Sequence, residues 1–276
     1  MKTATHLLVL VGAKSASSKW IAWEIERAKQ SDVRLKLAAV KLAKENGLRA
    51  ISIDPDLAEA HAALGLATIT HDFDWRKAES HFHRALEINP NYVLGRVWYC
   101  YFLGVEKRFD EAFEHIDEAM RLDAMTPIVA QTRNWTLYYA RRYAESLAAT
   151  EQLLAREPHY GLSHVFHSLV LSTLGRFDEA IGAAQKAERL LSRAPYTLLR
   201  LASSYAAAAR RAETFALLDE ISQMSRSGRY VSPYLTATVY VLLGEREHAF
   251  AELEKALATR DARLLWLGVD PHFDPL

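Results

Sequence analysis

The sequence contains a single cysteine, Cys100, among its 276 residues. One thiol excludes an intrachain disulfide and any zinc site built mainly from cysteines, and it fits a reducing compartment. Lys plus Arg and Asp plus Glu both number 34, so no net charge favours nucleic acid or an anionic membrane as a partner. No run approaches the roughly eighteen apolar residues that a membrane-spanning helix needs. We therefore expect a cytoplasmic protein with neither nucleic-acid nor membrane partners.

Motifs for catalysis and cofactor binding are also lacking. The sequence has no H-E-x-x-H, no G-x-S-x-G and no glycine-rich phosphate loop. His164 and His167 share a helix face and could begin a metal site, but no third ligand is indicated, so packing or surface roles are expected. The composition and motifs predict a protein without cofactor or metal that is not an enzyme.

What the sequence does contain is an internal repeat. The small residue that begins each predicted second helix recurs at spacings of 34, 34, 34, 34 and 35, at Ala78, Ala112, Ser146, Ala180, Thr214 and Ala249. The prolines at the repeat ends agree, since Pro55 and Pro90 are 35 residues apart and Pro90 and Pro158 are 68 apart, twice 34. A 34-residue period of paired helical patterns predicts stacked helix pairs.

The clearest copy runs from Pro55 to Pro90. It carries Leu64-Gly65 and Ala67 in its first helix and Ala78, Phe82, Ala85 and Pro90 in its second. In these residues the chain resembles the tetratricopeptide repeat (TPR) family. The resemblance implies an all-α fold, a right-handed superhelical solenoid of helix pairs. Small residues would let the two helices approach closely, while the large ones fill the space between them.

The repeats set the expected domain organisation. We assign residues 32–261 to the repeat array, of which 32–54 form a half repeat followed by about six repeats, and residues 262–276 to a C-terminal tail. Gly47 is expected to weaken the helix of the half repeat. Arg133-Asn134 in place of Leu-Gly, and Ala124 in place of a closing proline, predict kinked or looser units. The turn-rich segment 223–230 is expected to lengthen one loop between helices.

Two end segments resemble other proteins. Residues 6–28, HLLVLVGAKSASSKWIAWEIERA, resemble the middle of a TIR domain, in which a buried strand leads through a serine loop to a W-x-x-x-E helix start. We therefore assign residues 1–31 to a partial TIR-like strand-loop-helix segment. Near the C-terminus, LLWLGVDPHFDPL resembles the end of repeat arrays in bacterial regulators and adenylate-cyclase-like proteins. Together the two ends suggest a piece of a longer protein.

The TIR resemblance implies one candidate catalytic residue. In the NAD-cleaving members the glutamate of the motif is catalytic, and by position this is Glu24. Only five residues precede the His6 strand, so the upstream strands and loop that complete the cofactor pocket in that family are missing. The other interpretation of Glu24 is a solvated helix carboxylate, with Arg27 as its ion-pair neighbour.

In the TPR family the first helices of the pairs line a concave face that takes peptides. Its groove positions fall here on Leu94, Val97, Tyr101, Gln131, Trp135, Tyr138, Tyr139, Val165, Leu169, Tyr196, Leu199, Tyr234 and Thr238. Trp135, Tyr138 and Tyr139 share one helix face because they stand at i, i+3 and i+4. Such aromatics are enriched as anchors in interfaces, although they could also pack against the neighbouring repeat. The positions of a carboxylate-clamp asparagine hold other residues, so that binding mode is not expected.

These patterns give one preferred function and two alternatives. The preferred function is a non-catalytic protein- or peptide-binding scaffold or regulatory module of bacterial signalling, with the partner in the concave face. One alternative is a TIR-type NAD hydrolase whose fold is completed by another chain. The other is self-assembly through the apolar ends of the array.

Overall fold

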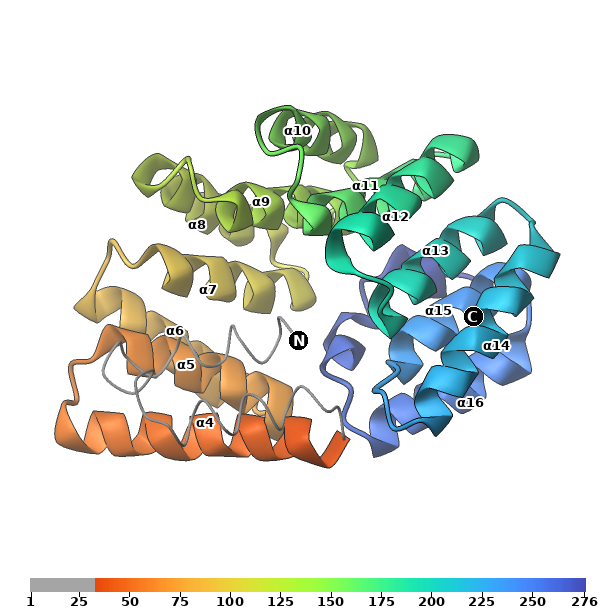
Figure 1. The fold of residues 1–276 in the computed structure, drawn as a ribbon. Coiled ribbons are helices and arrows are strands. Elements are labelled where there is room, and N and C mark those ends of the chain that lie inside the picture. Colours follow the sequence, from red (N-terminus) through yellow and green to blue (C-terminus); the bar gives the residue numbers. More distant parts are fainter. Residues whose placement is uncertain (1–32) are drawn as a thin grey trace. The chain divides into compact units, whose positions relative to one another are not determined.

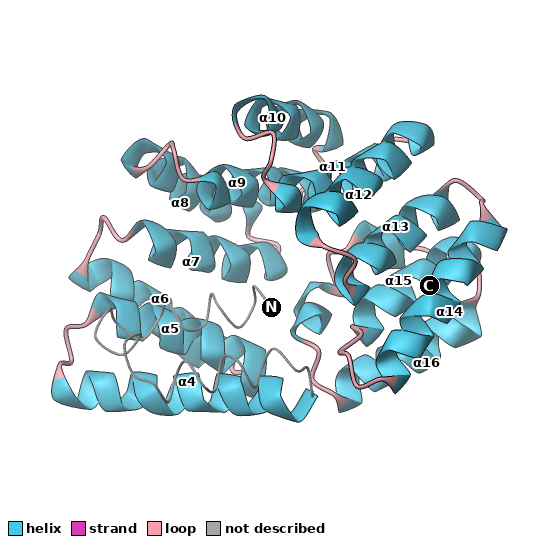
Figure 2. Cartoon of the chain, viewed as in Figure 1, coloured by secondary structure: helices cyan, strands magenta, loops and turns pink. Residues whose placement is uncertain are grey.

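The computed structural model describes residues 33–276, with side chains from residue 42 onward. This part of the chain contains 13 α-helices and no strand (Figures 1 and 2). The all-α fold class is confirmed for these residues. The strand, the serine loop and Glu24 of the TIR-like segment lie outside them.

The chain divides into two compact units, unit 1 up to Asp123 and unit 2 from Ala124 onward. The described part of unit 1 consists of α4 (Val33–Ile53), α5 (Ala58–Ala67), the π-helical turn η1 (Thr68–Asp72), α6 (Trp75–Ile88), α7 (Val93–Val105) and α8 (Phe109–Leu122). Unit 2 consists of α9 (Pro127–Tyr139), α10 (Tyr143–Arg156), α11 (Gly161–Thr173), α12 (Phe177–Leu191), α13 (Pro195–Ala207), α14 (Arg211–Arg226), α15 (Pro233–Leu243), α16 (Arg246–Ala258), η2 (Ala262–Trp266) and η3 (Pro271–Phe273).

From α5 onward, consecutive helices pack in six pairs, the first formed by α5 and α6 and the last by α15 and α16. Helix α4 packs on α5. The six small residues that revealed the period are all fully buried where each second helix meets its first: Ala78, Ala112, Ser146, Ala180, Thr214 and Ala249. Because a larger side chain there would push the helices apart, the period marks the positions of closest helix approach.

The turn inside each pair follows the same period. One residue of the turn has a left-handed backbone, with φ of 55° at Phe73, 62° at Lys107, 63° at Arg141, 74° at Gly175, 57° at Ala209 and 77° at Gly244. The next backbone N–H donates back into the first helix, as from Arg108 to Leu103 O at 2.9 Å and from Arg176 to Leu171 O at 2.9 Å. These bonds form a Schellman-type helix end, so each first helix stops at the same repeat position.

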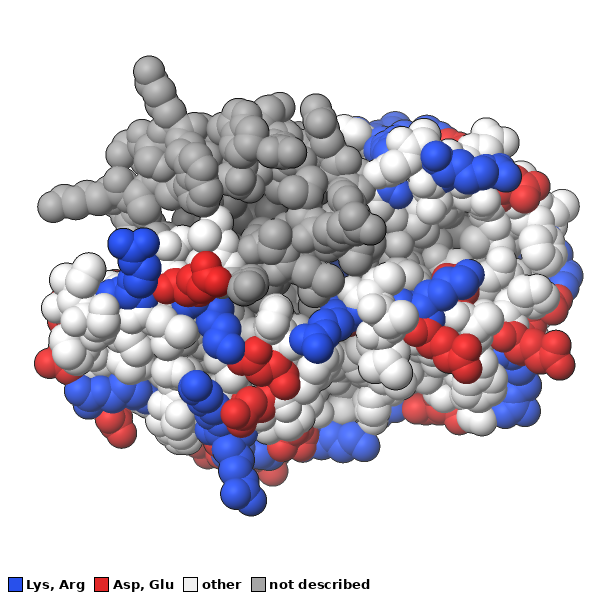
Figure 3. All heavy atoms as spheres, turned by 90° about the horizontal axis from the view of Figure 1, so that it is seen from below, with Lys and Arg blue, Asp and Glu red and all other residues white. Residues whose placement is uncertain are grey.

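Four of the six second helices, α8, α10, α12 and α14, also begin in a recurring way. An arginine at the N-cap pairs with the glutamate three residues on, in Arg108–Glu111, Arg142–Glu145, Arg176–Glu179 and Arg210–Glu213. The glutamates lie in the first turn, where the helix dipole favours negative charge. Figure 3 shows acidic and basic side chains interspersed on the face that it draws, as expected from the balanced composition.

The structure shows the outcome of three local expectations, which concern Gly47, helix α9 and the loop before α15. The helix of the half repeat runs unbroken through Gly47, where an added Cβ would lie 2.9 Å from the side chain of Leu64. The glycine thus permits close packing of α4 on α5. Helix α9, which contains Arg133-Asn134 and was expected to be kinked or looser, is continuous. Within its pair, the hydroxyl of Ser146 on α10 donates to Asn134 O at 2.9 Å. The expected long loop is present, spanning residues 227–232 between α14 and α15.

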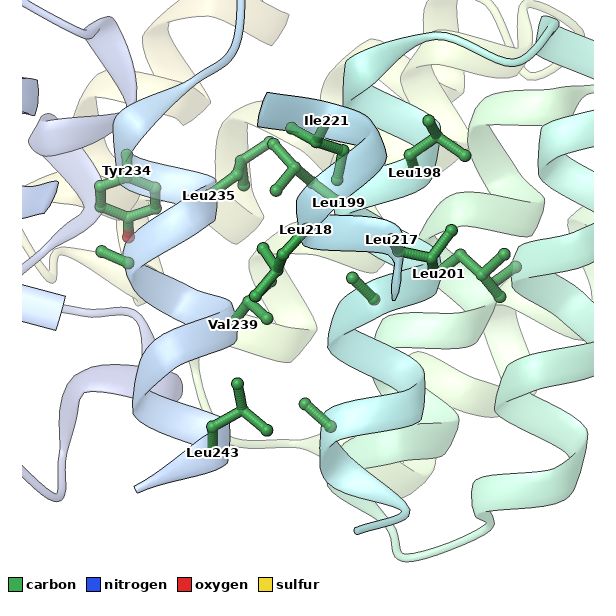
Figure 4. Packing of buried hydrophobic residues seen from close by; sticks show 14 of the residues in the cluster. Leu198, Leu199, Leu201, Leu217, Leu218, Ile221, Tyr234, Leu235, Val239 and Leu243 are labelled. Carbon is green, nitrogen blue, oxygen red and sulfur yellow. The ribbon is translucent and has the colours of Figure 1, made fainter. Parts of the chain in front are cut away.

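The best-defined core of unit 2 lies between α13, α14 and α15. Figure 4 shows Leu198 and Leu201 of α13, Leu217 and Ile221 of α14 and Leu235 of α15, which belong to one buried cluster. Phe273 of the C-terminal segment belongs to the same cluster. The C-terminal segment therefore packs into the core of the repeats. The same cluster contains Leu199 and Tyr234, two of the residues predicted for the interaction face.

Candidate interaction site

The C-terminal residues fold back onto unit 2. Residues 262–276 form the tail, which contains the short 3₁₀ helices η2 and η3. Asp261 and Asp270 cap these helices: each accepts a hydrogen bond at 3.1 Å from the backbone N–H two residues on, that of Arg263 and that of His272. The tail therefore has a defined local conformation that presents its side chains to the repeats.

Tyr139 and Arg141, at the end of α9, hold two points of the tail. The rings of Tyr139 and Trp266 are stacked, with centroids 4.3 Å apart and planes at 21°. Arg141 Nη2 donates to Asp274 Oδ1 at 2.9 Å. A stacked aromatic pair contributes about 0.5–1.5 kcal/mol beyond its buried area, whereas the exposed ion pair contributes less. The stack is therefore the main anchor at α9.

Tyr234 of α15 holds the middle of the tail. Its hydroxyl donates to Asp270 Oδ2 at 2.8 Å, and its ring centroid lies 5.1 Å from that of Phe273. Burial opposes ionisation of Asp270, but His272, whose Nδ1 lies 2.7 Å from Oδ1, and the Tyr234 hydroxyl hold the pKa of Asp270 below its usual value. Asp270 is thus a buried carboxylate with hydrogen bonds to both oxygens.

Two arginines lie against Tyr196 of α13. The guanidinium carbon of Arg263 is 5.3 Å from the ring centroid, and that of Arg200 is 5.9 Å away, both within cation–π range. Arg200 is half-buried, and its Nε has no hydrogen-bond partner in the described part of the chain. A half-buried guanidinium with an unsatisfied donor is unfavourable unless a ligand or water supplies an acceptor.

A small cavity lies beside Arg200. Its volume is only about 10 Å³, and it is lined by serines from α11 and α13, by Leu169 and Leu242, and by His272 of the tail. Ser168, Ser203 and Ser204 donate to carbonyls of their own helices, so they add no free donor to it. The cavity has room for little more than a water-sized group, which makes it an opening under the tail rather than a cofactor pocket.

The structure divides the predicted groove residues into two sets. Half-buried residues with part of their side chains accessible are Leu94, Tyr101, Trp135, Tyr139, Leu169 and Tyr196. Buried residues are Val97, Gln131, Tyr138, Val165, Leu199, Tyr234 and Thr238. The structure brings Tyr139, Leu169, Tyr196 and Tyr234 together beneath or beside the tail, whereas Leu94 and Tyr101 lie on α7 of unit 1.

Several buried members of the predicted set have interior roles. Tyr138 is fully buried, packs on Phe166 at 5.7 Å between ring centroids, and shares a hydrogen bond of 3.1 Å with Thr173. Gln131 accepts from the Ser163 hydroxyl at 2.6 Å, which links α9 to α11. These two side chains join neighbouring repeats, so the expectation that they face a partner is corrected: their surroundings are the core between helices.

The tail side chains and the two arginines are not among the residues predicted from the sequence. Trp266, Asp270, Phe273, Arg200 and Arg263 carry most of the contacts described above. A signal was present in the tail, where aromatic and apolar residues alternate with aspartates. It could not indicate a docking site because the tail lies outside the 34-residue period.

Other polar clusters do not form a metal site. Among residues 33–276, no group of three or more His, Cys, Asp or Glu side chains is placed to hold a metal ion. His164 is buried, and its Nε2 lies 2.9 Å from Pro158 O. None of the described helices is both long and apolar enough to cross a membrane.

Comparison with solved structures identifies the fold. A TPR protein from Parabacteroides merdae superposes with a TM-score of 0.59 at 12% identity, over 89% of this chain and 95% of that one. The described chain has the TPR fold. A thermophilic TPR protein from Thermus thermophilus matches with a TM-score of 0.55 at 18% identity, over 61% of this chain and 92% of that one.

A third TPR-like neighbour is PilW, described as a widely conserved type IV pilus biogenesis factor. It matches with a TM-score of 0.55 at 16% identity, over 79% of this chain and 97% of its own. A family model described as the TIR-like domain of Thoeris protein ThsB matches residues 1–47, which confirms the predicted TIR resemblance of the N-terminal segment. A search of curated proteins finds no match.

Proposed function

We propose that this chain is a non-catalytic scaffold or regulatory module that binds peptides on the first helices of its repeats. In this proposal it acts in bacterial signalling, in the cytoplasm. The observation that supports the proposal is the seating of the tail. A short segment of polypeptide lies against α9, α13 and α15 and is held by side chains of the kind that bind peptides in trans. A face that accommodates one peptide segment has the shape and chemistry to take another.

The residues proposed for partner contact are the accessible members of the predicted set. In unit 2 these are Trp135, Tyr139, Leu169 and Tyr196, and in unit 1 they are Leu94 and Tyr101. Rigid aromatic side chains supply large contact areas at a small loss of conformational entropy, which makes them effective anchors. The TPR fold supports protein binding in general but does not identify the partner.

A displayed peptide library panned against the immobilised chain tests this function. We expect enriched peptides whose affinity falls about tenfold or more in Tyr139→Ala with Tyr196→Ala, or in Tyr101→Ala if unit 1 is the site. Phe250→Ala is the matched control, because Phe250 is a half-exposed aromatic of α16 away from the first-helix face. Failure to enrich any peptide, both on wild type and on a chain whose tail anchors are removed by Trp266→Ala with Phe273→Ala, would contradict the proposed site, as would equal binding by all variants.

A second candidate function rests on the family match to residues 1–47. The matched segment contains Glu24, which corresponds to the catalytic glutamate of NAD-cleaving TIR domains. In this proposal another chain completes the TIR fold and Glu24 supports NAD hydrolysis. Nicotinamide release by the wild type that is lost in Glu24→Ala would support it, and equal rates in the two proteins would contradict it.

Self-assembly through the array ends remains a third proposal. Exposed apolar side chains occur on the first and last described α-helices, where Ile53 of α4 is 84% and Leu257 of α16 is 67% exposed. Such residues favour end-to-end association in repeat proteins that lack a polar cap. Light scattering across a concentration series distinguishes the cases, since a constant monomer mass is incompatible with assembly.

A further inference from the structure

The tail meets unit 2 through a short sequence pattern. Trp266 stacks on Tyr139, Asp270 accepts from the Tyr234 hydroxyl four residues later, and Phe273 packs on the Tyr234 ring three residues after that. These contacts come from α9 and α15, which belong to different repeats. Two aromatic anchors around one buried carboxylate are enough to define both the position and the direction of a bound segment.

We propose that the first-helix face of unit 2 is a regulated site for an acidic peptide segment of a partner protein with the pattern aromatic-x-x-x-Asp-x-x-Phe, which the tail occupies in cis. The proposal rests on the proposed peptide-binding function and names the partner's chemistry and its regulation. When the partner binds, its aromatic residue takes the place of Trp266 and its aspartate that of Asp270.

The charges of the face favour an acidic partner. Two arginines of the face, Arg141 and Arg200, lie at the tail, and the tail leaves the buried Nε of Arg200 without a hydrogen-bond partner in the described part of the chain. The tail therefore does not use every group that the face offers. A partner with a further carboxylate near Arg200 would satisfy that donor and compete with the tail despite the tail's advantage of being tethered.

Tethering determines how the site responds. A segment joined to its own site has an effective concentration in the millimolar range, so a free peptide with the same contacts binds wild type only weakly. Weakening the tail by mutation removes this competition without altering α9, α13 or α15. The affinity of the exposed face then becomes measurable.

The test uses the full chain and a fluorescent peptide with the sequence of residues 261–276, DARLLWLGVDPHFDPL. The variant Trp266→Ala with Phe273→Ala releases the tail, and Phe250→Ala is the control. We expect fluorescence anisotropy to report binding about tenfold or more tighter to the released variant than to wild type or Phe250→Ala. Peptides carrying Trp266→Ala or Asp270→Asn are expected to bind the released variant about tenfold more weakly.

A second measurement on wild type guards against loss of folding in the released variant. Excess unlabelled peptide is expected to speed amide hydrogen exchange in the chain's own residues 262–276 at least severalfold, because it displaces them. Unchanged exchange at saturating peptide, or no binding of the peptide to a released variant with normal helicity, would show that the tail is a fixed structural cap and overturn the proposal.

Two further outcomes distinguish this proposal from the proposed peptide-binding function alone and from exchange of tails between two copies of the chain. Library peptides that bind wild type without competing with the tail peptide would leave the proposed function standing and overturn the cis-occupied site. A dimer that forms in wild type at high concentration and is lost on tail release would mean that tails exchange between two copies, which overturns the choice of a separate partner.

Discussion

Single side chains set the distance between helices in each pair. At Gly65 of α5, an added Cβ would lie 2.9 Å from Cζ of Phe82 on α6. At Gly182 of α12, an added Cβ would meet no atom within 4 Å. The two glycines occupy the same kind of backbone but differ in surroundings, so one is required by packing and the other is not.

This contrast gives a paired prediction at the residue scale. Gly65→Ala is expected to destabilise the protein by about 1–3 kcal/mol, because Phe82 must move within a packed interior. Gly182→Ala is expected to stabilise it by about 0.5–1 kcal/mol, because alanine favours the helix more than glycine does. Urea unfolding followed by circular dichroism measures both. Destabilisation of equal size in the two variants would contradict the packing argument.

Two half-buried histidines of unit 1 predict a loss of stability in acid. Burial and the neighbouring His61 lower the pKa of His81 to about 4, and burial and Arg96 lower that of His115 to about 4. The unfolded chain, with histidine pKa values near 6.5, binds more protons than the folded one between about pH 6.5 and 4. Stability is therefore complete above about pH 6.5 and falls as the pH is lowered toward 4.

The measurement is the urea midpoint at several pH values between 7 and 4. His81→Gln and His115→Gln are each expected to reduce the fall, since glutamine does not titrate in this range. His248→Gln is the control, because His248 is exposed on α16 and belongs to unit 2. If the loss of stability in acid is the same in wild type, His81→Gln and His115→Gln, titratable groups other than these two histidines cause it.

At the scale of elements, the turns between paired helices repeat one backbone geometry with different residues. Glycine supplies the left-handed residue at Gly175 and Gly244, whereas Lys107, Arg141 and Ala209 adopt the same conformation with a Cβ. The left-handed region costs a residue with a Cβ about 1–2 kcal/mol, which the surrounding repeat compensates. These turns are therefore sites where the array stores local strain.

Ala209→Gly is the corresponding prediction. Relief of the left-handed strain outweighs the greater flexibility of glycine in the unfolded chain, so we expect a gain of about 0.5–1 kcal/mol. Ala208→Gly is the matched control, because Ala208 has an ordinary φ of −80° and gains nothing from glycine. Thermal unfolding that ranks Ala208→Gly above Ala209→Gly would disprove the assignment.

At the scale of the whole molecule, the tail joins parts of unit 2 that are far apart in the sequence. Arg141 and Asp274, which form an ion pair, are 133 residues apart, and Trp266 reaches Tyr139 of α9 from η2. Asp270 is the only tail carboxylate in these contacts that is buried. Its hydrogen bond from Tyr234 is therefore expected to matter more for tail docking than the exposed ion pair.

Tyr234→Phe tests this bond. The variant leaves a buried carboxylate oxygen without its donor, so we expect a loss of about 1–3 kcal/mol together with faster hydrogen exchange in residues 262–276. Tyr240→Phe is the control, because Tyr240 of α15 is half-buried and packs on His248 rather than on the tail. Equal effects of the two changes would indicate that the hydroxyl of Tyr234 contributes little.

The repeat positions were predictable because they depend on local packing. Ala112 and Ser146 had to be small in any stack of this period, and both are fully buried. The face that each aromatic residue adopts was harder to predict. A first helix packs against its own second helix and also against neighbouring repeats, so Tyr138 and Tyr139, adjacent in sequence, end in different surroundings, one in the core and one beneath Trp266.

The sequence by itself determined the all-α repeat fold, the helix pairs and the small residues at their contacts, since these recur with a 34-residue period and involve neighbours in the chain. Only the tertiary structure decided that the tail lies on the predicted interaction face and that Asp270 is held by Tyr234. Those contacts join distant, non-repeating segments, and their complementarity exists only once the helices have been stacked.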